Sequence, residues 1–407
     1  MLEPTRRDIL TTTIRGEHRA RSGVAAFASW QRSLDLVLQQ VMIAGDSPPD
    51  LVVMFAAREY ADAAQELVRQ AKVRTGAETL IGCFGSGCIG NGRELERTPG
   101  LSMLALWMPG ARLEAQHIDQ ATLRSTTGNA PPRAGADDDV RGWLVLTDPY
   151  SFDVQRLIQR LQDQSPGVPV LGGMSSCHTG AGKQPARLFI DDQVFEEGAV
   201  TLVLRGAFDI VPIVTQSCEP IGDTWTVTDV DRTAVLSISG RPAIDRLIET
   251  VAALSPEQQR RAKRHLVVGL AADEYRDEYH RGDFLIRGLL GVDHARAALL
   301  VGDRPRVGQT IQFQLRDPVT AGIDMHQHLL EARAMLGERK PFAALMASCS
   351  GRGSGLFGKP DHDVQALQSA FPGMAVGGFI STGEIGPVGK TCGLHSFSAS
   401  IMLLVER

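Results

Sequence analysis

Two short segments near the C-terminus hold the residues best suited to chemistry. The first, Ser348–Gly353, follows an apolar run and contains the thiol of Cys349, the cation of Arg352 and two glycines, Gly351 and Gly353. Glycines at the end of a strand allow backbone N–H groups to face a ligand. The segment therefore predicts a site for a carboxylate or a similar anionic group.

The second segment places a carboxylate at the end of a neighbouring apolar run, and its candidate site residues are Ser381, Gly383 and Glu384. If the two segments are adjacent, Arg352 and the amides would bind the carboxylate of a small zwitterion such as an amino acid. Glu384 would bind its ammonium group. The alternative is that Arg352 and Glu384 pair with each other.

Cys349 could also act as a nucleophile, because a nearby arginine lowers the pKa of a thiol. Nucleophilic catalysis needs a base as well, and His362 and His395 are available in the sequence, although nothing places either beside the thiol. A buried and inert cysteine is the alternative. We expect a binding protein rather than an enzyme.

Two further arginines, Arg287 and Arg316, lie at or near the ends of apolar strands. A charge in such a place is either paired or directed into a pocket. Asp283 and Asp317 are the partners closest in sequence, so structural ion pairs are expected, and Arg287 is also a candidate ligand-binding residue.

The sequence does not indicate a metal site. His326 and His328 are two residues apart at a helix start, so they would point to different faces of the helix. The segment 361–363, Asp-His-Asp, is typical of a turn that caps the next helix. The chain has no C-x-x-C and no H-E-x-x-H motif.

A repeat organises the elements that must position these residues. Three stretches, Leu51–Met108, Trp143–Arg205 and Phe342–Val405, each read as strand, amphipathic helix, glycine-rich strand and third strand. The glycines would either expose amides to a ligand or allow close backbone packing. The pattern predicts an α+β fold of layered mixed β-sheets with packed helices, built from repeated strand-helix-strand-strand units in two pseudo-repeated halves.

Before the first copy the pattern predicts a helix over Ala25–Ile43, and between the first and second copies it predicts a mobile, solvated loop at about 122–140. Three successive strands, Arg187–Asp191, Ala199–Arg205 and Phe208–Thr215, are expected to be antiparallel because short turns join them.

Composition sets broad limits on function. The chain has 407 residues, a net charge of −5 with both signs interspersed, and six cysteines without paired close spacing. A nucleic-acid partner is therefore not expected. The absence of an apolar run of roughly 20 residues predicts no membrane span. The cysteine usage fits a reducing compartment, so we expect a cytoplasmic protein.

Six short segments, in order along the chain, resemble the FIST domain family (F-box and intracellular signal transduction). They are Pro169–Gly173, Cys218–Gly222, Gly282–Asp293, Ser348–Gly353, Leu356–Gly358 and Gly383–Pro387. The resemblance implies an N-terminal FIST domain over 1–215 and a C-terminal FIST domain over 216–407.

The resemblance further implies a small-ligand-binding sensory protein whose ligand is an amino acid or a similar metabolite. No F-box precedes the segments and no signalling output domain follows them, so a separate signalling protein is the expected partner. Some bacterial members are similar to haem-dependent nitric oxide sensors, which makes haem a possible cofactor with a Cys or His ligand. A cysteine-dependent transferase using Cys349 is the third alternative.

Overall fold

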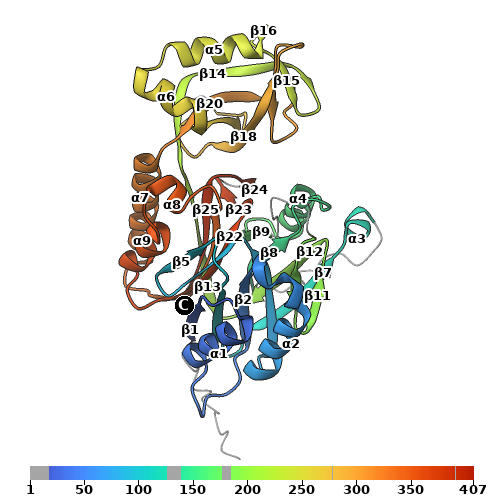
Figure 1. Cartoon of the computed structure of the whole chain (residues 1–407), viewed down its shortest axis with the longest axis vertical. Coiled ribbons are helices and arrows are strands. Elements are labelled where there is room, and N and C mark those ends of the chain that lie inside the picture. Colours follow the sequence, from blue (N-terminus) through green and yellow to red (C-terminus); the bar gives the residue numbers. More distant parts are fainter. Residues whose placement is uncertain (1–17, 126–138, 177–184, 277, 390) are drawn as a thin grey trace, which may run out of the picture.

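Three mixed sheets, each centred on one copy of the repeat, form the main body of the chain (Figure 1). The computed structural model describes residues 18–125, 139–176, 185–276, 278–389 and 391–407. In each copy two parallel strands flank a crossover, and a third strand pairs antiparallel with the first. These triplets are β2 (Leu51–Ala57), β3 (Thr79–Gly85) and β6 (Leu101–Trp107); β8 (Val140–Thr147), β9 (Val170–Met174) and β12 (Ala199–Arg205); and β21 (Pro341–Cys349), β22 (Ala375–Ser381) and β25 (Ser398–Glu406).

Further strands complete the three sheets, whose orders are β1-β6-β2-β3-β10-β11, β24-β23-β9-β8-β12-β7 and β13-β25-β21-β22-β4-β5. The β4-β5 hairpin lies within the first copy in sequence, between β3 and β6, but joins the sheet of the third, because β4 pairs with β22. The added strands are β1 (Arg19–Ala25), β4 (Gly87–Gly90), β5 (Arg93–Glu96), β7 (Arg112–Ile118), β10 (Leu188–Ile190), β11 (Gln193–Phe195), β13 (Phe208–Gln216), β23 (Glu384–Val388) and β24 (Thr391–His395).

The three sheets share one apolar core. Phe55 of the first sheet stacks on Phe379 of the third, with ring centroids 4.8 Å apart, and Leu144 of the second belongs to the same cluster. Helices cover the outer faces, so the central strands are buried on both sides. The helices of this body are α1 (Trp30–Val41), the 3-10 helix η1 (Arg58–Ala63), α2 (Ala64–Thr75), α3 (Gln120–Arg124), α4 (Val154–Gln164), α7 (Pro318–Leu336), α8 (Ser354–Phe357) and α9 (His362–Ala370).

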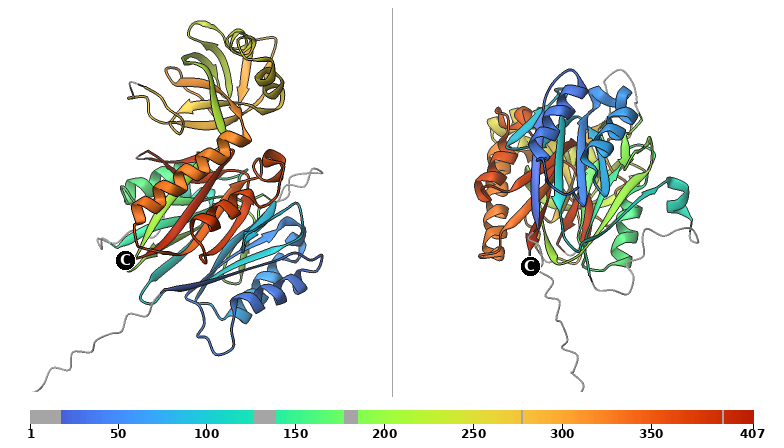
Figure 2. Two further views of the ribbon diagram at one scale, coloured as in Figure 1. Left: turned by 90° about the vertical axis from the view of Figure 1, so that its left-hand side faces the viewer. Right: turned by 90° about the horizontal axis from the view of Figure 1, so that it is seen from below.

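Residues 218–316 form a second unit, here called the inserted unit, which lies at one end of the three-sheet body (Figures 1 and 2). The chain enters it from β13 and returns through α7, which runs down the side of the body in Figure 2. The unit contains β14 (Cys218–Asp231), β15 (Ala234–Ile238), β16 (Arg241–Pro242), α5 (Ala243–Ala252), α6 (Pro256–His265), β17 (Leu266–Ala271), β18 (Phe284–Asp293), β19 (Ala298–Val301) and β20 (Thr310–Arg316).

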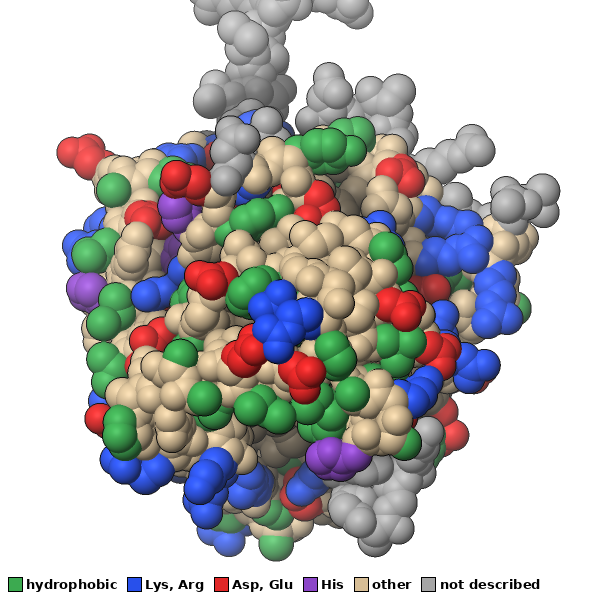
Figure 3. All heavy atoms as spheres, turned by 90° about the horizontal axis from the view of Figure 1, so that it is seen from above, with side chains coloured by type: hydrophobic (Ala, Val, Ile, Leu, Met, Phe, Trp, Pro, Cys, Tyr) green, Lys and Arg blue, Asp and Glu red, His purple; other side chains and the backbone are tan. Residues whose placement is uncertain are grey.

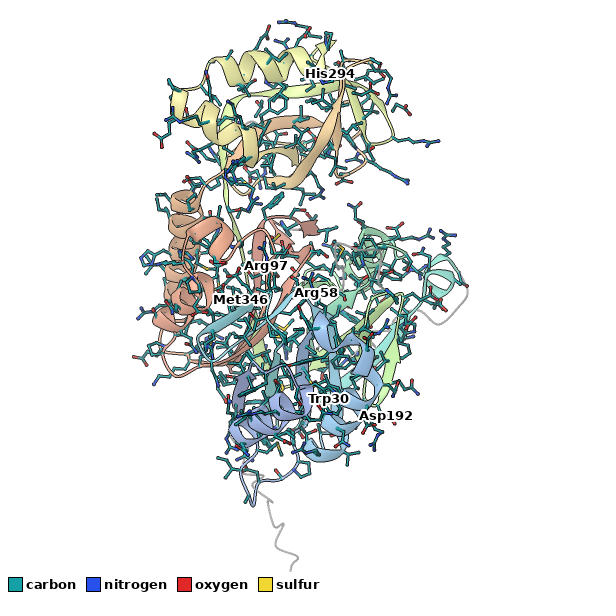
Figure 4. The ribbon with its side chains drawn as sticks, viewed as in Figure 1. Trp30, Arg58, Arg97, Asp192, His294 and Met346 are labelled. Carbon is teal, nitrogen blue, oxygen red and sulfur yellow. The ribbon has the colours of Figure 1, made fainter. Side chains whose placement is uncertain are left out.

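The residues of the expected C-terminal domain, 216–407, therefore lie in both units. In Figure 4 the label Met346 marks the part in the body, on β21, and the label His294 marks the part in the inserted unit, at its far end. The body takes up residues 317–407 because β25 pairs along the whole length of β13. The predicted α+β class with layered mixed sheets and packed helices is confirmed.

The glycines shared by the three copies serve backbone packing. Gly82, Gly172 and Gly378 occupy equivalent positions on the second parallel strand of each triplet. A Cβ atom at any of them would overlap the carbonyl oxygen of the facing residue on the first strand, which is Met54, Val145 or Met346. The close-packing alternative is therefore the correct one for these three glycines.

Two of the expected elements differ in the structure. The helix expected from Ala25 begins at Trp30, with Ser29 as its N-cap, because residues 19–25 pair with β6 as a strand. The three strands expected to be antiparallel do not pair with one another but join three different sheets, since β10 pairs with β3, β12 with β8 and β13 with β25. Most of the loop expected at 122–140, residues 126–138, lies outside the described residues.

Cations and carboxylates are interspersed on the outer face of the inserted unit (Figure 3). Among the described residues, no helix has both the length and the apolar character that a membrane crossing requires.

Candidate functional site

The two C-terminal segments meet where β21 and β22 end. Cys349 and Ser381 are partners in the parallel ladder, and the hydroxyl of Ser381 donates a hydrogen bond to the carboxylate of Glu384. The backbone N–H of Phe397, from the turn between β24 and β25, donates to Sγ of Cys349 at 3.2 Å. The predicted proximity of the two segments is therefore present in the structure.

Arg352 forms its ion pair with Asp363, at the start of α9. Nε lies 2.6 Å from Oδ2 and Nη2 lies 2.8 Å from Oδ1, and both side chains are fully buried. Burial alone would raise the pKa of the Asp363 carboxyl, but the charge and hydrogen bonds of Arg352 outweigh it and hold that pKa below its usual range. Arg352 thus makes neither an ion pair with Glu384 nor an open contact with solvent. Its Nη1 atom is buried without a hydrogen-bond partner.

Glu384 is also completely buried, among hydroxyl groups. It accepts hydrogen bonds from Ser381 and from the backbone N–H and the hydroxyl of Ser398, the last at 2.8 Å. Burial raises the pKa of the Glu384 carboxyl to about 7, against the lowering effect of these hydrogen bonds. The side chain can therefore exchange a proton near neutral pH.

Cys349 has no thiolate, and neither of the two candidate histidines bonds to it. Burial raises the pKa of its thiol to about 12, so the group is protonated at neutral pH. Nε2 of His395 is bonded to the carbonyl of Gly386 at 3.1 Å, and Nδ1 of His362 to Asp363 at 2.9 Å. This environment fits an inert thiol and does not favour the transferase alternative.

The serine-rich ends of the three repeat copies also converge here, but their polar groups bond to one another. The hydroxyl of Ser175 donates to the carbonyl of Phe84, and that of Ser176 to Ile380, both at 2.8 Å. The hydroxyl of Thr382 donates to the carbonyl of Ser175 at 3.1 Å. These hydrogen bonds connect the three sheets, so the strand ends position the site rather than offer unpaired groups to a ligand.

Arg316 is a site residue that the sequence did not identify as one. Its expected partner, Asp317, caps α7 and pairs with Arg261 at 2.7 Å instead. Nη2 of Arg316 donates to the carbonyl of Gly351, and the guanidinium lies 4.4 Å above the ring of Phe397. Its Nε atom is buried without a partner, and no carboxylate of the described residues forms an ion pair with it. No sequence signal placed Arg316 beside Gly351, because 35 residues separate them.

Arg287, on β18, lies where the inserted unit touches the body. Its guanidinium pairs with Asp303 at 2.5 Å and donates from Nη1 to the carbonyl of Leu394, on β24, at 2.9 Å. Asp283, the expected partner, pairs with Arg276. Arg287 is therefore a contact between the two units, and its predicted role toward a ligand stays a prediction.

Three of the buried Cys and His side chains are not placed to hold a porphyrin. Haem needs an axial Cys or His inside a cavity that encloses the ring. Cys218, Cys349 and His395 are packed in the interior, with exposed fractions of 0%, 6% and 1%. The described part of the chain holds no group of three or more His, Cys, Asp and Glu side chains that could bind a metal ion.

Comparison with known proteins agrees with this arrangement. The FIST N domain model matches residues 50–241 and the FIST C domain model matches residues 243–387. An uncharacterized protein of Mycobacterium tuberculosis strain H37Rv is 36% identical over 368 residues, which cover 89% of this chain and 93% of that protein. An uncharacterized protein of Mycobacterium bovis is 33% identical over 365 residues, covering 89% and 92%. The chain therefore belongs to the FIST family and carries both its N and its C domain.

Proposed function

We propose that this protein is a sensory protein that binds an amino acid or a similar small metabolite, without catalysis, and signals through a separate partner protein. The presence of both FIST domains supports the sensory role. The ligand site is the junction between the inserted unit and the body, where Arg316, Arg352 and Glu384 surround the segment 349–353.

Two unsatisfied nitrogen atoms carry the proposal. Nε of Arg316 and Nη1 of Arg352 are both buried without an acceptor, and Arg316 is bonded to Gly351, the neighbour of Arg352. A buried donor without a partner costs about 1–3 kcal/mol, and such groups in native proteins call for an explanation such as a bound ion. The carboxylate of a ligand would satisfy both nitrogens, and Glu384 would take its ammonium group.

The location of the site suggests how binding would be signalled. The chain crosses between the units only at residues 216–218 and 316–318, and Arg287 adds a bond from β18 to β24. Because the two nitrogens are buried, a ligand reaches them when the inserted unit moves relative to the body. Binding would then shift the population of the two arrangements, and a partner protein would recognise one of them.

The test is a thermal-shift and calorimetric screen of the full chain against the common amino acids and their 2-oxo acids. A true ligand at 100-fold its dissociation constant raises the free energy of unfolding by about 2.7 kcal/mol. Arg316→Gln should abolish that gain, whereas Arg304→Gln, at an exposed arginine of the same unit, should keep it. A wild-type protein that responds to no member of the panel would contradict the proposal.

A further inference from the structure

A groove of about 600 Å³ runs along α7, on the side of the body shown at the left of Figure 1. Its walls are the aliphatic side chains of Val319, Ile323 and Leu330, and its polar groups are His326, Gln327 and His362. Val319 is 67% exposed, Ile323 56% and Leu330 50%. Three large aliphatic side chains are thus exposed on the same face as the polar groups of the groove.

A buried ion pair orients one of the polar groups. Asp363 is paired with Arg352 on its buried side, and its Oδ1 atom also lies 2.9 Å from Nδ1 of His362. Because the Asp363 carboxyl is ionised and can only accept, Nδ1 of His362 is the donor in this bond. The imidazole also stacks on Phe357, with ring centroids 3.5 Å apart and the planes 7° from parallel. The ring is therefore fixed in both position and tautomer.

The other ring nitrogen faces the groove. Gly322 lines the groove on α7. A Cβ atom added to Gly322 would lie 3.5 Å from Nε2 of His362, which is the nearest atom outside the backbone of α7. With Nδ1 bonded to Asp363, Nε2 accepts a hydrogen bond when the ring is neutral and donates one when it is charged. The groove thus has an aliphatic wall and, at the α9 side, one oriented hydrogen-bonding group.

We propose that this groove binds a carboxylic acid with an aliphatic tail, whose head group meets Nε2 of His362. A carboxylic acid donates to the neutral imidazole and a carboxylate accepts from the charged one, so the pair forms in either state. No Asp, Glu, Lys or Arg lines the groove, and the carboxylate that bonds to His362, Asp363, is neutralised by its ion pair with Arg352. Apolar contact with Val319, Ile323 and Leu330 holds the tail. This site goes beyond the proposed function and is separate from the nitrogens of Arg316 and Arg352.

The test is isothermal titration calorimetry of the full chain with sodium octanoate below its micellar concentration, and with octan-1-ol, which has the same tail length and an uncharged head group. Octanoate should bind about tenfold more tightly than octan-1-ol, because a hydrogen bond to a charged group adds roughly one such factor. His362→Leu, which removes the hydrogen bond to either head group, should lower octanoate affinity more than octan-1-ol affinity. Ile323→Asp should abolish the binding of both.

Met335→Asp is the matched control, since Met335 is 68% exposed on the same helix and does not line the groove. It should leave both affinities unchanged. Octanoate and octan-1-ol binding equally well, no binding of octanoate, or equal losses in Ile323→Asp and Met335→Asp would each overturn the proposal. So would binding of haemin that Ile323→Asp abolishes, without octanoate binding. Any of these outcomes leaves the junction site and its screen unaffected.

Discussion

Arg287 of the inserted unit donates a hydrogen bond to the backbone carbonyl of Leu394 in the three-sheet body, at 2.9 Å. Leu394 precedes His395, which is the ladder partner of Glu384. The Arg287 side chain thus connects β18 to the strand beside the buried carboxylate. Any rotation of the inserted unit that moves Arg287 acts directly on β24.

Arg287→Met is expected to loosen β24 from the inserted unit. The change keeps most of the side-chain stem but removes the bond to Leu394 and the ion pair with Asp303, which together contribute about 1–3 kcal/mol. Amide hydrogen exchange in Thr391–His395 should therefore become faster, as followed by mass spectrometry of the native chain. Arg304→Met should not change it. Unaltered exchange in β24 of the Arg287→Met variant would show that the contact does not couple the units.

Arg352→Met is expected to destabilise the protein by about 3–5 kcal/mol in urea denaturation, because it leaves the carboxylate of Asp363 buried without its cation. The double variant Arg352→Met, Asp363→Leu should recover part of the loss, since it removes the unpaired charge as well. Arg296→Met is the control, because the Arg296–Asp293 pair is exposed to solvent and such pairs add little to stability. Equal effects of Arg352→Met and Arg296→Met would contradict the assigned burial of the pair.

The repeat explains why much of the body could be predicted from the sequence. Strand, amphipathic helix and glycine-rich strand are local patterns, so the sequence predicts all three copies. The parallel pairing of the first two strands in each copy follows from the crossover that joins them. The meeting of Cys349 and Ser381 follows as well, since they end neighbouring strands of one copy, and Glu384 begins the next strand of the chain.

Partners distant in sequence could not be predicted. Asp317 and Asp283 are the nearest acids along the chain, yet Arg316 bonds to Gly351 and Arg287 to Leu394. These contacts depend on how the inserted unit docks onto the body, which no local pattern encodes. For the same reason the sheets that β10, β12 and β13 join were missed, because alternation in a strand specifies its faces and not its neighbours.

Glu384→Gln is expected to remove a pH dependence of stability. The pKa of Glu384 rises from 4.5 to about 7 in the folded protein, so the folded state binds the proton more tightly than the unfolded state. The contribution of Glu384 to the free energy of unfolding should therefore be greatest below pH 4.5. This contribution should fall by roughly 3 kcal/mol as the pH rises from 4.5 through 7.

His395 acts in the opposite direction, because burial lowers its pKa from 6.5 to about 4 and its stabilising contribution is lost as the pH falls through that range. The measurement is therefore the difference between wild type and Glu384→Gln in urea denaturation from pH 5 to pH 8, in which the contribution of His395 cancels. The variant should gain stability relative to wild type as the pH rises. A difference that is constant across this range would show that Glu384 titrates near its ordinary value.

Gly82→Ala tests whether the shared glycine of the repeat serves packing. An added methyl group would overlap the carbonyl oxygen of Met54 on the facing strand, in the first of the three equivalent places. Because β2 and β3 are both buried, neither strand can move away without disturbing the core, and overpacking of this kind costs about 1–3 kcal/mol.

Gly355→Ala is the matched control, since nothing lies within 4 Å of the added atom. In α8 the alanine should be neutral or stabilising by up to about 1 kcal/mol. Urea denaturation of the two variants separates the outcomes, and equal stability of Gly82→Ala and wild type would show that the strands tolerate the methyl group.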